Sequence, residues 1–364
     1  MERGDLATER SRRSAVEIEF VNASKRYPGQ DVPAIRSLSL KVPAGEICCL
    51  VGPSGGGKTT AMKLVNRLIE LTDGDVLIGG RSVQSVDPVD LRREIGYVIQ
   101  EVGLFPHMTV AGNIAVVPRL LRWPAKRVAA RVSELLALVR LDPAMSARYP
   151  AQLSGGQQQR VGLARALAVD PPVMLMDEPF GALDPVTRSE VQDELLRLQA
   201  QIHRTVIFVT HDIDEAIKMG DRIAVLREGG ELAQYATADE LLGHPADGYV
   251  AGFVGADRAL KRLSLRRVGD LVGPAAGLPG SGPPHLATAA GAALGFPGAG
   301  ARAAPAVSAD TSLRVALSVL LDSGASELDV TGGDGTALGR LSLDRLREAL
   351  AADPRVPAAE GARR

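Results

Sequence analysis

The sequence is poor in cysteine and in aromatic residues. Its 364 residues include two cysteines and 3% aromatic side chains. Cys48 and Cys49 are adjacent, and neighbours on a strand point to opposite faces, so we expect reduced packing residues and no disulfide framework. No apolar run approaches the roughly 18–20 residues of a membrane-spanning helix, and the first residues lack the apolar core of a signal peptide. These absences predict a cytosolic protein, or one docked onto a membrane component.

An excess of charge of either sign is also missing. The chain has 42 Lys and Arg against 43 Asp and Glu, a net charge of −1 at pH 7. Bulk charge therefore gives no reason to expect a nucleic-acid partner. Apolar residues make up 45% of the sequence, which is enough for a packed core, and the length allows more than one domain.

Periodicity separates strands from helices in the first two thirds of the chain. Alternation over 16–20 and 37–42, with a hairpin arm at 76–80, predicts a half-exposed antiparallel sheet. Residues around 109–170 are expected to be mainly helical, and 128–141 is the clearest amphipathic stretch.

A second sheet is predicted further along the chain. Residues 173–176 and 206–209 are apolar throughout and are separated by a helical stretch over 188–201. Apolar strands joined by a helix indicate a buried parallel sheet.

The last quarter of the chain changes composition. Residues 273–309 are mostly Gly, Ala and Pro, which predicts a linker. Beyond it we expect a helix at 312–321, strands at 327–330 and 338–341 joined by a tight turn, and a last helix at 343–350. A unit of fewer than about 50 residues would struggle to bury a stable core alone.

Residues 52–60 read GPSGGGKTT, between an apolar strand at 47–51 and a helical stretch from 61. This layout is that of a phosphate-binding P-loop, in which glycines let backbone N–H groups surround phosphate oxygens. Lys58 would reach the β- and γ-phosphates and the Thr59 hydroxyl would bind Mg²⁺. A flexible glycine turn with a solvated lysine is the alternative, so partners elsewhere in the chain must decide.

The strand at 173–176 ends in Asp177 and Glu178. Ligands gather at the carboxyl edge of such sheets. Asp177 is therefore the expected carboxylate for Mg²⁺, bound either directly or through a water, and Glu178 is the expected general base for an attacking water. The alternative is a solvated Asp-Glu-Pro turn.

Residues 153–160 read LSGGQQQR. Ser154 and the glycines form a second phosphate-friendly helix start, although Ser154 alone would serve equally as a helix cap. The octet resembles the signature motif of ABC-type ATPases. Gln100 then stands at the position of that family's Q-loop glutamine, Asp184 in its D-loop, His211 at its switch histidine, and Tyr27 at the aromatic that stacks on adenine.

The resemblance covers residues 16–240 and implies an α/β fold. It is that of a P-loop NTPase ABC cassette, with a mixed, mainly parallel sheet core, an antiparallel β subdomain and an α-helical subdomain. Two cassettes would close head to tail around two ATP molecules with Mg²⁺. The implied catalytic residues are Glu178, His211 and Gln100, and the implied metal ligands are Thr59, Gln100 and Asp177.

The remaining nucleotide contacts follow from the same resemblance. Gly56 stands where Ser is frequent, but its backbone N–H survives. The implied contacts are Tyr27, Gly52, Pro53, Ser54, Gly55, Gly56, Gly57, Lys58, Thr59, Thr60 and Asp177 in one subunit, with Ser154, Gly155 and Gly156 from the opposite subunit and Asp184 communicating across the interface.

Two segments point to a subfamily. Residues 96–109 and 253–264 resemble the ATPase subunits of importers for quaternary ammonium osmoprotectants such as glycine betaine, choline, carnitine and proline betaine. The alternative for 253–264 is a basic amphipathic helix with a solvated face. Residues 306–352 resemble half of a CBS domain, and two such halves would pair across the homodimer unless the unit is a decayed remnant.

These resemblances give a domain plan and a set of partners. Predicted are a disordered tail at 1–15, a nucleotide-binding domain at 16–268 with a helical subdomain at about 101–165, a linker at 269–305, a CBS-like half module at 306–352 and a tail at 353–364. The expected protein is an ATP hydrolase on the cytoplasmic face of the inner membrane. Its partners would be a second copy, separate permease subunits and, indirectly, an extracytoplasmic substrate-binding protein, but no nucleic acid.

Three alternatives remain at this stage. The chain could energise import of another small solute such as an amino acid. It could be a soluble ABC ATPase not involved in transport, although such proteins normally carry coiled-coil insertions or two fused cassettes. It could act mainly as a regulatory ligand-binding protein through its tail, against which the intact Glu178 and His211 argue.

Overall fold

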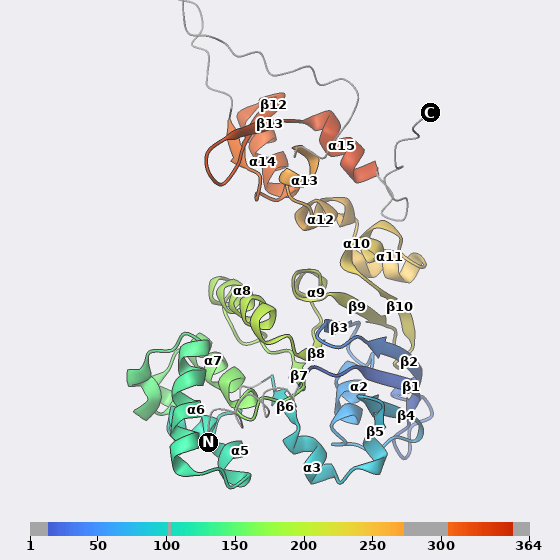
Figure 1. Cartoon of the computed structure of the whole chain (residues 1–364). Helices are drawn as coiled ribbons and strands as arrows, with labels where there is room; N and C mark the ends of the chain where they lie inside the picture. Colours follow the sequence, from blue (N-terminus) through green and yellow to red (C-terminus); the bar gives the residue numbers. More distant parts are fainter. Residues whose placement is uncertain (1–13, 101–102, 273–304, 352–364) are drawn as a thin grey trace, which may run out of the picture. The chain divides into compact units, whose positions relative to one another are not determined.

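A computed structural model describes residues 14–100, 103–272 and 305–351. The chain forms two compact units (Figure 1). The first runs to Leu241 and takes up Pro245–Phe253, and the second comprises Leu242–His244 and the chain from Val254. The predicted tails at 1–15 and 353–364 and the predicted linker at 269–305 lie largely outside the described residues.

A six-stranded sheet is the centre of the first unit. Its strand order is β10-β9-β3-β8-β7-β6, with all neighbours parallel except the antiparallel edge strand β10. β7 and β8 pair in parallel, so the predicted buried parallel sheet is confirmed. The strands are β3 (Ile47–Val51), β6 (Ile95–Val98), β7 (Val173–Asp177), β8 (Thr205–Val209), β9 (Arg222–Leu226) and β10 (Leu232–Ala236).

The register of this sheet positions the site. β3, β7 and β8 run in the same direction, with Leu50 opposite Val209 and Val209 opposite Asp177. Their carboxyl ends therefore meet at one edge, and the segments that follow each strand come together there.

β3 is buried along its whole length. Cys48 and Cys49 are free thiols with no exposed surface. Burial raises the pKa of Cys48 to about 12 and raises that of Cys49 as well. Both residues thus act as small apolar packing groups, as the alternation along the strand predicted.

A separate four-stranded antiparallel sheet has the order β2-β1-β4-β5. Ile35, Leu38, Leu40 and Val42 of β2 point into the core, while the intervening residues are exposed. This alternation gives the half-exposed sheet that the sequence predicts. The strands are β1 (Ile18–Lys25), β2 (Ile35–Val42), β4 (Asp73–Ile78) and β5 (Arg81–Ser82).

Helices make up most of the segment between β6 and β7 (Figure 1). The predicted helix at 128–141 is α6, but it spans Ala125–Leu138. It begins directly after Pro124 and ends before Arg140, whose φ of +52° no helix can continue. The first unit's helices are α2 (Lys58–Val65), α3 (Pro88–Arg93), α4 (Val110–Ile114), α5 (Val116–Leu120), α6, α7 (Gly155–Ala166), α8 (Pro185–Ile202), α9 (Ile213–Met219), α10 (Ala238–Gly243) and α11 (Gly248–Val254), with 3₁₀ turns at Val83–Ser85, Pro143–Ala147 and Pro150–Gln152; α10 and α11 each carry a residue or more into the second unit.

The second unit has a three-stranded sheet of order β11-β12-β13, with β11 parallel to β12. Its core includes Leu263, Val268 and Val272, which precede the predicted half module. Residues 254–272 therefore belong to the core of this small unit. Its elements are α12 (Arg258–Leu265), α13 (Gly269–Val272), β11 (Ala306–Ser308), α14 (Leu313–Ser323), β12 (Glu327–Thr331), β13 (Ala337–Ser342) and α15 (Leu343–Ala351).

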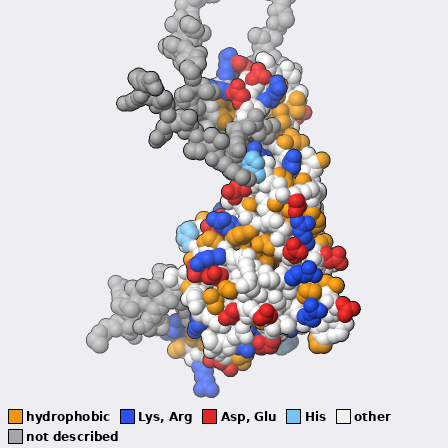
Figure 2. Space-filling view, turned by 90° about the vertical axis from the view of Figure 1, so that its right-hand side faces the viewer, with side chains coloured by type: hydrophobic (Ala, Val, Ile, Leu, Met, Phe, Trp, Pro, Cys, Tyr) orange, Lys and Arg blue, Asp and Glu red, His pale blue; other side chains and the backbone are white. Residues whose placement is uncertain are grey.

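Two features of the surface bear on function. On the face shown in Figure 2, Lys and Arg side chains are interspersed with Asp and Glu. Among the described residues, no helix has the length and apolar character to cross a bilayer.

Candidate functional site

The glycine-rich loop lies between β3 and α2 and has a fixed shape. Gly52 has φ +151° and Gly57 has φ +77°. A Cβ at Gly52 would lie 2.4 Å from the carbonyl oxygen of Leu226, and one at Gly57 would lie 2.4 Å from that of Ala34. Glycine is required at both positions because neighbouring backbone fills the space of a side chain. The alternative of a loose glycine turn is thus not what the structure shows.

Gly56 stands where the implied family has a frequent serine. Its N–H donates to the carbonyl of Pro53 at 3.1 Å. A Cβ here would approach the same oxygen to 3.0 Å, a tight but smaller conflict than at Gly52 or Gly57. The N–H of Gly56 therefore helps close the loop on itself.

Lys58, the first residue of α2, is held against the loop. Its Nζ donates to the carbonyl oxygens of Gly52 and Pro53, both at 2.8 Å, and the residue is 8% exposed. Burial lowers its pKa, while Glu178 and Asp177 act in the opposite direction. The Lys58 ammonium is thus held at the loop by two carbonyl groups and is largely removed from solvent.

Thr59 and Asp177 bring two oxygen ligands together. The Thr59 hydroxyl donates to Asp177 Oδ1 at 3.1 Å, joining the start of α2 to the end of β7. Burial raises the pKa of Asp177, and the hydrogen bond from Thr59 lowers it. A hydroxyl and a carboxylate are the donors that Mg²⁺ prefers, so this pair fits the predicted metal site.

Glu178 occupies a strained backbone position directly after β7. Its φ is +43°, unusual for a residue other than glycine. Its N–H donates to the carbonyl of Val209 at 2.9 Å, which attaches it to the end of β8. Strain of this kind is maintained where the surrounding structure fixes a side chain for function.

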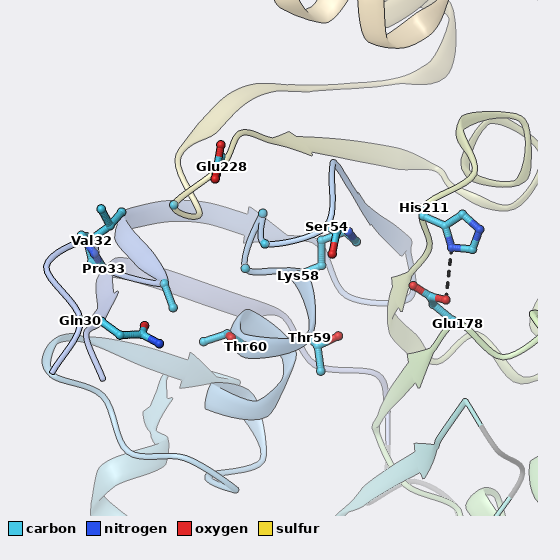
Figure 3. Close-up of a pocket in the computed structure, with 15 residues that line it drawn as sticks. Gln30, Val32, Pro33, Ser54, Lys58, Thr59, Thr60, Glu178, His211 and Glu228 are labelled. Carbon is cyan, nitrogen blue, oxygen red and sulfur yellow. Dashed lines mark ion pairs between the residues drawn. The ribbon is translucent and has the colours of Figure 1, made fainter. Parts of the chain in front are cut away.

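The Glu178 carboxylate contacts two predicted partners, of which Figure 3 shows His211. His211 Nδ1 lies 3.2 Å from Oε2, and Gln100 Nε2 donates to the same oxygen at 3.3 Å. Glu178 is 22% exposed and His211 is 68% exposed. The carboxylate is therefore oriented by neighbours yet open to solvent, as a group that takes a proton from water needs to be.

A cavity of about 620 Å³ connects the glycine-rich loop and Lys58 with Glu178 and His211, while Asp177 and Gln100 are not among its lining residues. Figure 3 shows Lys58, Thr59 and Thr60 between Glu178 with His211 on one side and Gln30, Val32 and Pro33 on the other. The lining residues are Gln30, Val32, Pro33, Ala34, Ser54, Gly55, Gly56, Gly57, Lys58, Thr59, Thr60, Glu178, His211, Glu228 and Gly229. Sequence reasoning did not find Gln30, Val32, Pro33 or Glu228, since none carries a local phosphate-binding pattern.

Tyr27 is not among the lining residues. It is partly buried, and Lys25 Nζ lies 5.2 Å from its ring centroid. The segment that follows it, from Gln30 to Ala34, does line the cavity. Stacking of Tyr27 on adenine remains a prediction.

The signature and D-loop residues also lie outside this cavity. Ser154 caps α7, accepting from Gln157 N–H at 3.3 Å. Asp184 caps α8, accepting from Val186 and Thr187 N–H groups, both at 3.1 Å. The Thr187 side chain, followed by these backbone N–H groups, holds the pKa of Asp184 below its usual range. Both residues thus have a capping role within their own chain.

Part of the 253–264 segment forms α12 in the second unit. Lys261 and Arg262 are 9% and 8% exposed. Lys261 Nζ donates to Val254 O at 3.1 Å and lies 3.4 Å from Asp257 Oδ1. The alternative of a solvated basic face therefore does not hold for these two residues.

Comparisons with known proteins identify the family to which this chain is similar. Residues 35–181 match the family described as ABC transporter. The choline transport ATP-binding protein OpuBA of Bacillus subtilis is 53% identical over 243 residues, covering 67% of this chain and 63% of the relative. The glycine betaine uptake system ATP-binding protein YehX of Escherichia coli is 47% identical over 256 residues, covering 70% of this chain and 82% of the relative.

A solved structure of an ABC transporter cassette is also similar to this chain. The dimeric structure of MJ0796, a bacterial ABC transporter cassette, aligns with TM-score 0.54 and 34% identity, covering 60% of this chain and 98% of that chain. The matched region spans slightly under two thirds of the length of OpuBA. The chain belongs to the ABC transporter family and is one of its ATP-binding proteins.

Proposed function

We propose that this chain is the ATP-hydrolysing subunit of an ABC importer for quaternary ammonium osmoprotectants. The observation that carries the catalytic part is the placement of Glu178, with His211 and Gln100 on one carboxylate oxygen, at the rim of a cavity lined by the glycine-rich loop. Family membership and the shared sheet edge support the same reading.

The loop and Lys58 bind the phosphates of ATP. The glycine conformations fix the backbone around the phosphate position, and the Lys58 ammonium, poised on two loop carbonyls, exchanges these for phosphate oxygens. The β- and γ-phosphate charge is offset by Mg²⁺ when it is bound, and Thr59 with Asp177 is the pair placed to hold it. Gln100, the third residue of the predicted metal set, would supply its side-chain oxygen to the bound ion while its Nε2 faces Glu178.

Glu178 acts as general base. Its carboxylate accepts a proton from the attacking water, and His211 and Gln100 keep the accepting oxygen oriented. His211 is more exposed than Glu178, so it can contact the γ-phosphate while it orients the carboxylate.

A second copy completes the site. Ser154, Gly155 and Gly156 lie outside the cavity of their own chain, so they serve the γ-phosphate of the partner's ATP. The dimeric MJ0796 structures supply the precedent, one of them titled as a post-hydrolysis state bound to ADP and Pi. ATP then shifts an open–closed equilibrium because it binds the closed dimer better.

The substrate class rests on relatives. Those at about 50% identity are named for choline, glycine betaine, carnitine and osmoprotectant transport. The transported solute would pass through separate permease subunits, and the chain would sit on the cytoplasmic face of the membrane, with an extracytoplasmic binding protein delivering the solute.

Another small solute is the second candidate. A sulfate/thiosulfate import ATP-binding protein of Synechocystis is 44% identical over 242 residues, which shows that the cassette varies little with cargo. Uptake of labelled betaine, choline, carnitine, proline and sulfate, with the cognate permease and across an osmotic series, decides between them. Uptake of sulfate alone would overturn the osmoprotectant assignment while leaving the ATPase assignment intact.

A further inference from the structure

Hydrogen bonds hold the loop that carries His211 on both sides of this residue. Thr210 is 1% exposed, and its hydroxyl oxygen accepts the N–H of Asp212 at 3.0 Å. Asp212 caps α9, accepting from Asp214 N–H at 2.8 Å and Glu215 N–H at 3.3 Å. The position of His211 therefore depends on where Thr210 and the start of α9 are held.

Glu215 holds the start of α9 to α8. Its Oε1 accepts from Gln192 Nε2 at 2.9 Å, and Gln192 is only 6% exposed. Burial raises the pKa of the half-buried Glu215. The hydrogen bond is specific because the buried Gln192 amide would lose its partner if the carboxylate moved.

We propose that Glu215 is a positioning residue that fixes the His211 loop against Glu178. The inference rests on the proposed function, in which His211 serves the chain's own ATP.

The test is a double-mutant cycle on the full chain, measured as ATPase turnover and ATP binding. We expect Glu215→Ala, which removes the acceptor of the Gln192 hydrogen bond, to lower kcat about tenfold, as misplacement of catalytic groups does, and to change ATP affinity less than about twofold. In a His211→Ala background, Glu215→Ala should cause no further loss, because it acts through His211. Gln192→Met, which removes the donor at 2.9 Å, should behave alike if Glu215→Ala folds poorly.

A matched control separates positioning from simple attachment of the helices. Lys218 Nζ lies 2.8 Å from Asp193 Oδ1 and joins α9 to α8 on the exposed side. Lys218→Met should leave kcat within about twofold, since it removes a surface ion pair and exposed hydrogen bonds to Ser189.

Two results would overturn the inference while leaving the proposed function standing. One is an additive loss of turnover in the His211→Ala background, and the other is an equal loss in Lys218→Met. Absence of ATPase activity in the unaltered dimer with its permease is a different result, because it overturns the proposed function itself.

Discussion

His211 Nδ1 lies 3.2 Å from Glu178 Oε2 although 33 residues (178 to 211) separate them in sequence. The contact exists because β7 and β8 are parallel neighbours, which brings the residues after both strands to one edge. The same oxygen receives Gln100 from the segment after β6. The residues that surround the Glu178 carboxylate thus follow three neighbouring strands of the sheet, β6, β7 and β8.

Replacing Glu178 by Gln tests the general base. We expect turnover to fall by about 10²–10⁴-fold, because proton transfer is lost while size is kept. ATP binding should persist and ATP-bound dimers should accumulate, measured by nucleotide titration and size-exclusion chromatography. Hydrolysis at the unaltered rate would remove Glu178 from the mechanism.

Replacing Lys58 by Ala tests the phosphate assignment. Charge-assisted hydrogen bonds contribute about 1.5–3 kcal/mol each, so ATP affinity should weaken by about tenfold or more. AMP, which lacks the β- and γ-phosphates, serves as a control ligand whose affinity should change little. Undiminished ATP affinity would contradict the assignment.

Gly57 and Gly55 form a matched pair for the loop geometry. Their φ values are +77° and +80°, but only at Gly57 does a Cβ meet backbone, while that at Gly55 meets nothing within 4 Å. Gly55→Ala should lower stability by about 1–2 kcal/mol through its φ alone. Gly57→Ala should lower it further and weaken ATP binding, measured by thermal unfolding and titration; equal effects would contradict the packing argument.

Asp177 should destabilise the nucleotide-free protein. Burial raises the pKa of Asp177 in the folded protein. The contribution of this group to the free energy of unfolding is therefore favourable below the usual aspartate pKa and is lost as the pH rises through the pKa of the folded protein. Asp177→Asn should therefore raise the melting temperature at pH 7 without nucleotide, yet reduce the further rise that Mg²⁺ with ATP gives. Asp184, whose pKa is lowered by its capping hydrogen bonds, is the control of opposite sign, since Asp184→Ala should lower the melting temperature. A lower melting temperature for Asp177→Asn would contradict the burial argument.

The second unit should fold only with its preceding helices. Leu263, Val268 and Val272 contribute to its core, so a fragment of residues 254–364 should show cooperative unfolding by circular dichroism. A fragment of residues 300–364 loses these contacts and should be largely unfolded. Cooperative unfolding of the shorter fragment would contradict this. Sedimentation of the longer fragment would also show whether two copies pair, as predicted for the CBS-like half module.

Much of this could be predicted from residues alone because phosphate chemistry needs special local patterns. The glycines, Lys58 and the acids after an apolar strand are such patterns. Gln30, Val32, Pro33 and Glu228 carry none, and they reach the cavity only through the packing of the two sheets' loops. β9 and β10 were not predicted either, although Gly229 and Gly230 between them are a turn signal.

The sequence predicted the type of an element better than the residues at which it begins and ends. The amphipathic pattern located α6, but Pro124 and the positive φ of Arg140 set its ends. Ser154 was recognised from its motif, and its hydrogen bond from Gln157 N–H shows that it caps α7. Its role across the dimer stays a prediction.

The burial of Cys48 and Cys49 has a practical consequence. Their thiols have no exposed surface, and burial holds the pKa of Cys48 at about 12. Neither forms the thiolate that maleimides and methanethiosulfonates attack at neutral pH. The natural chain therefore needs no cysteine removal before single cysteines are introduced at exposed positions outside the nucleotide cavity and the signature motif. Spin or fluorescent labels placed there would report the opening and closing of the dimer without prior removal of native thiols.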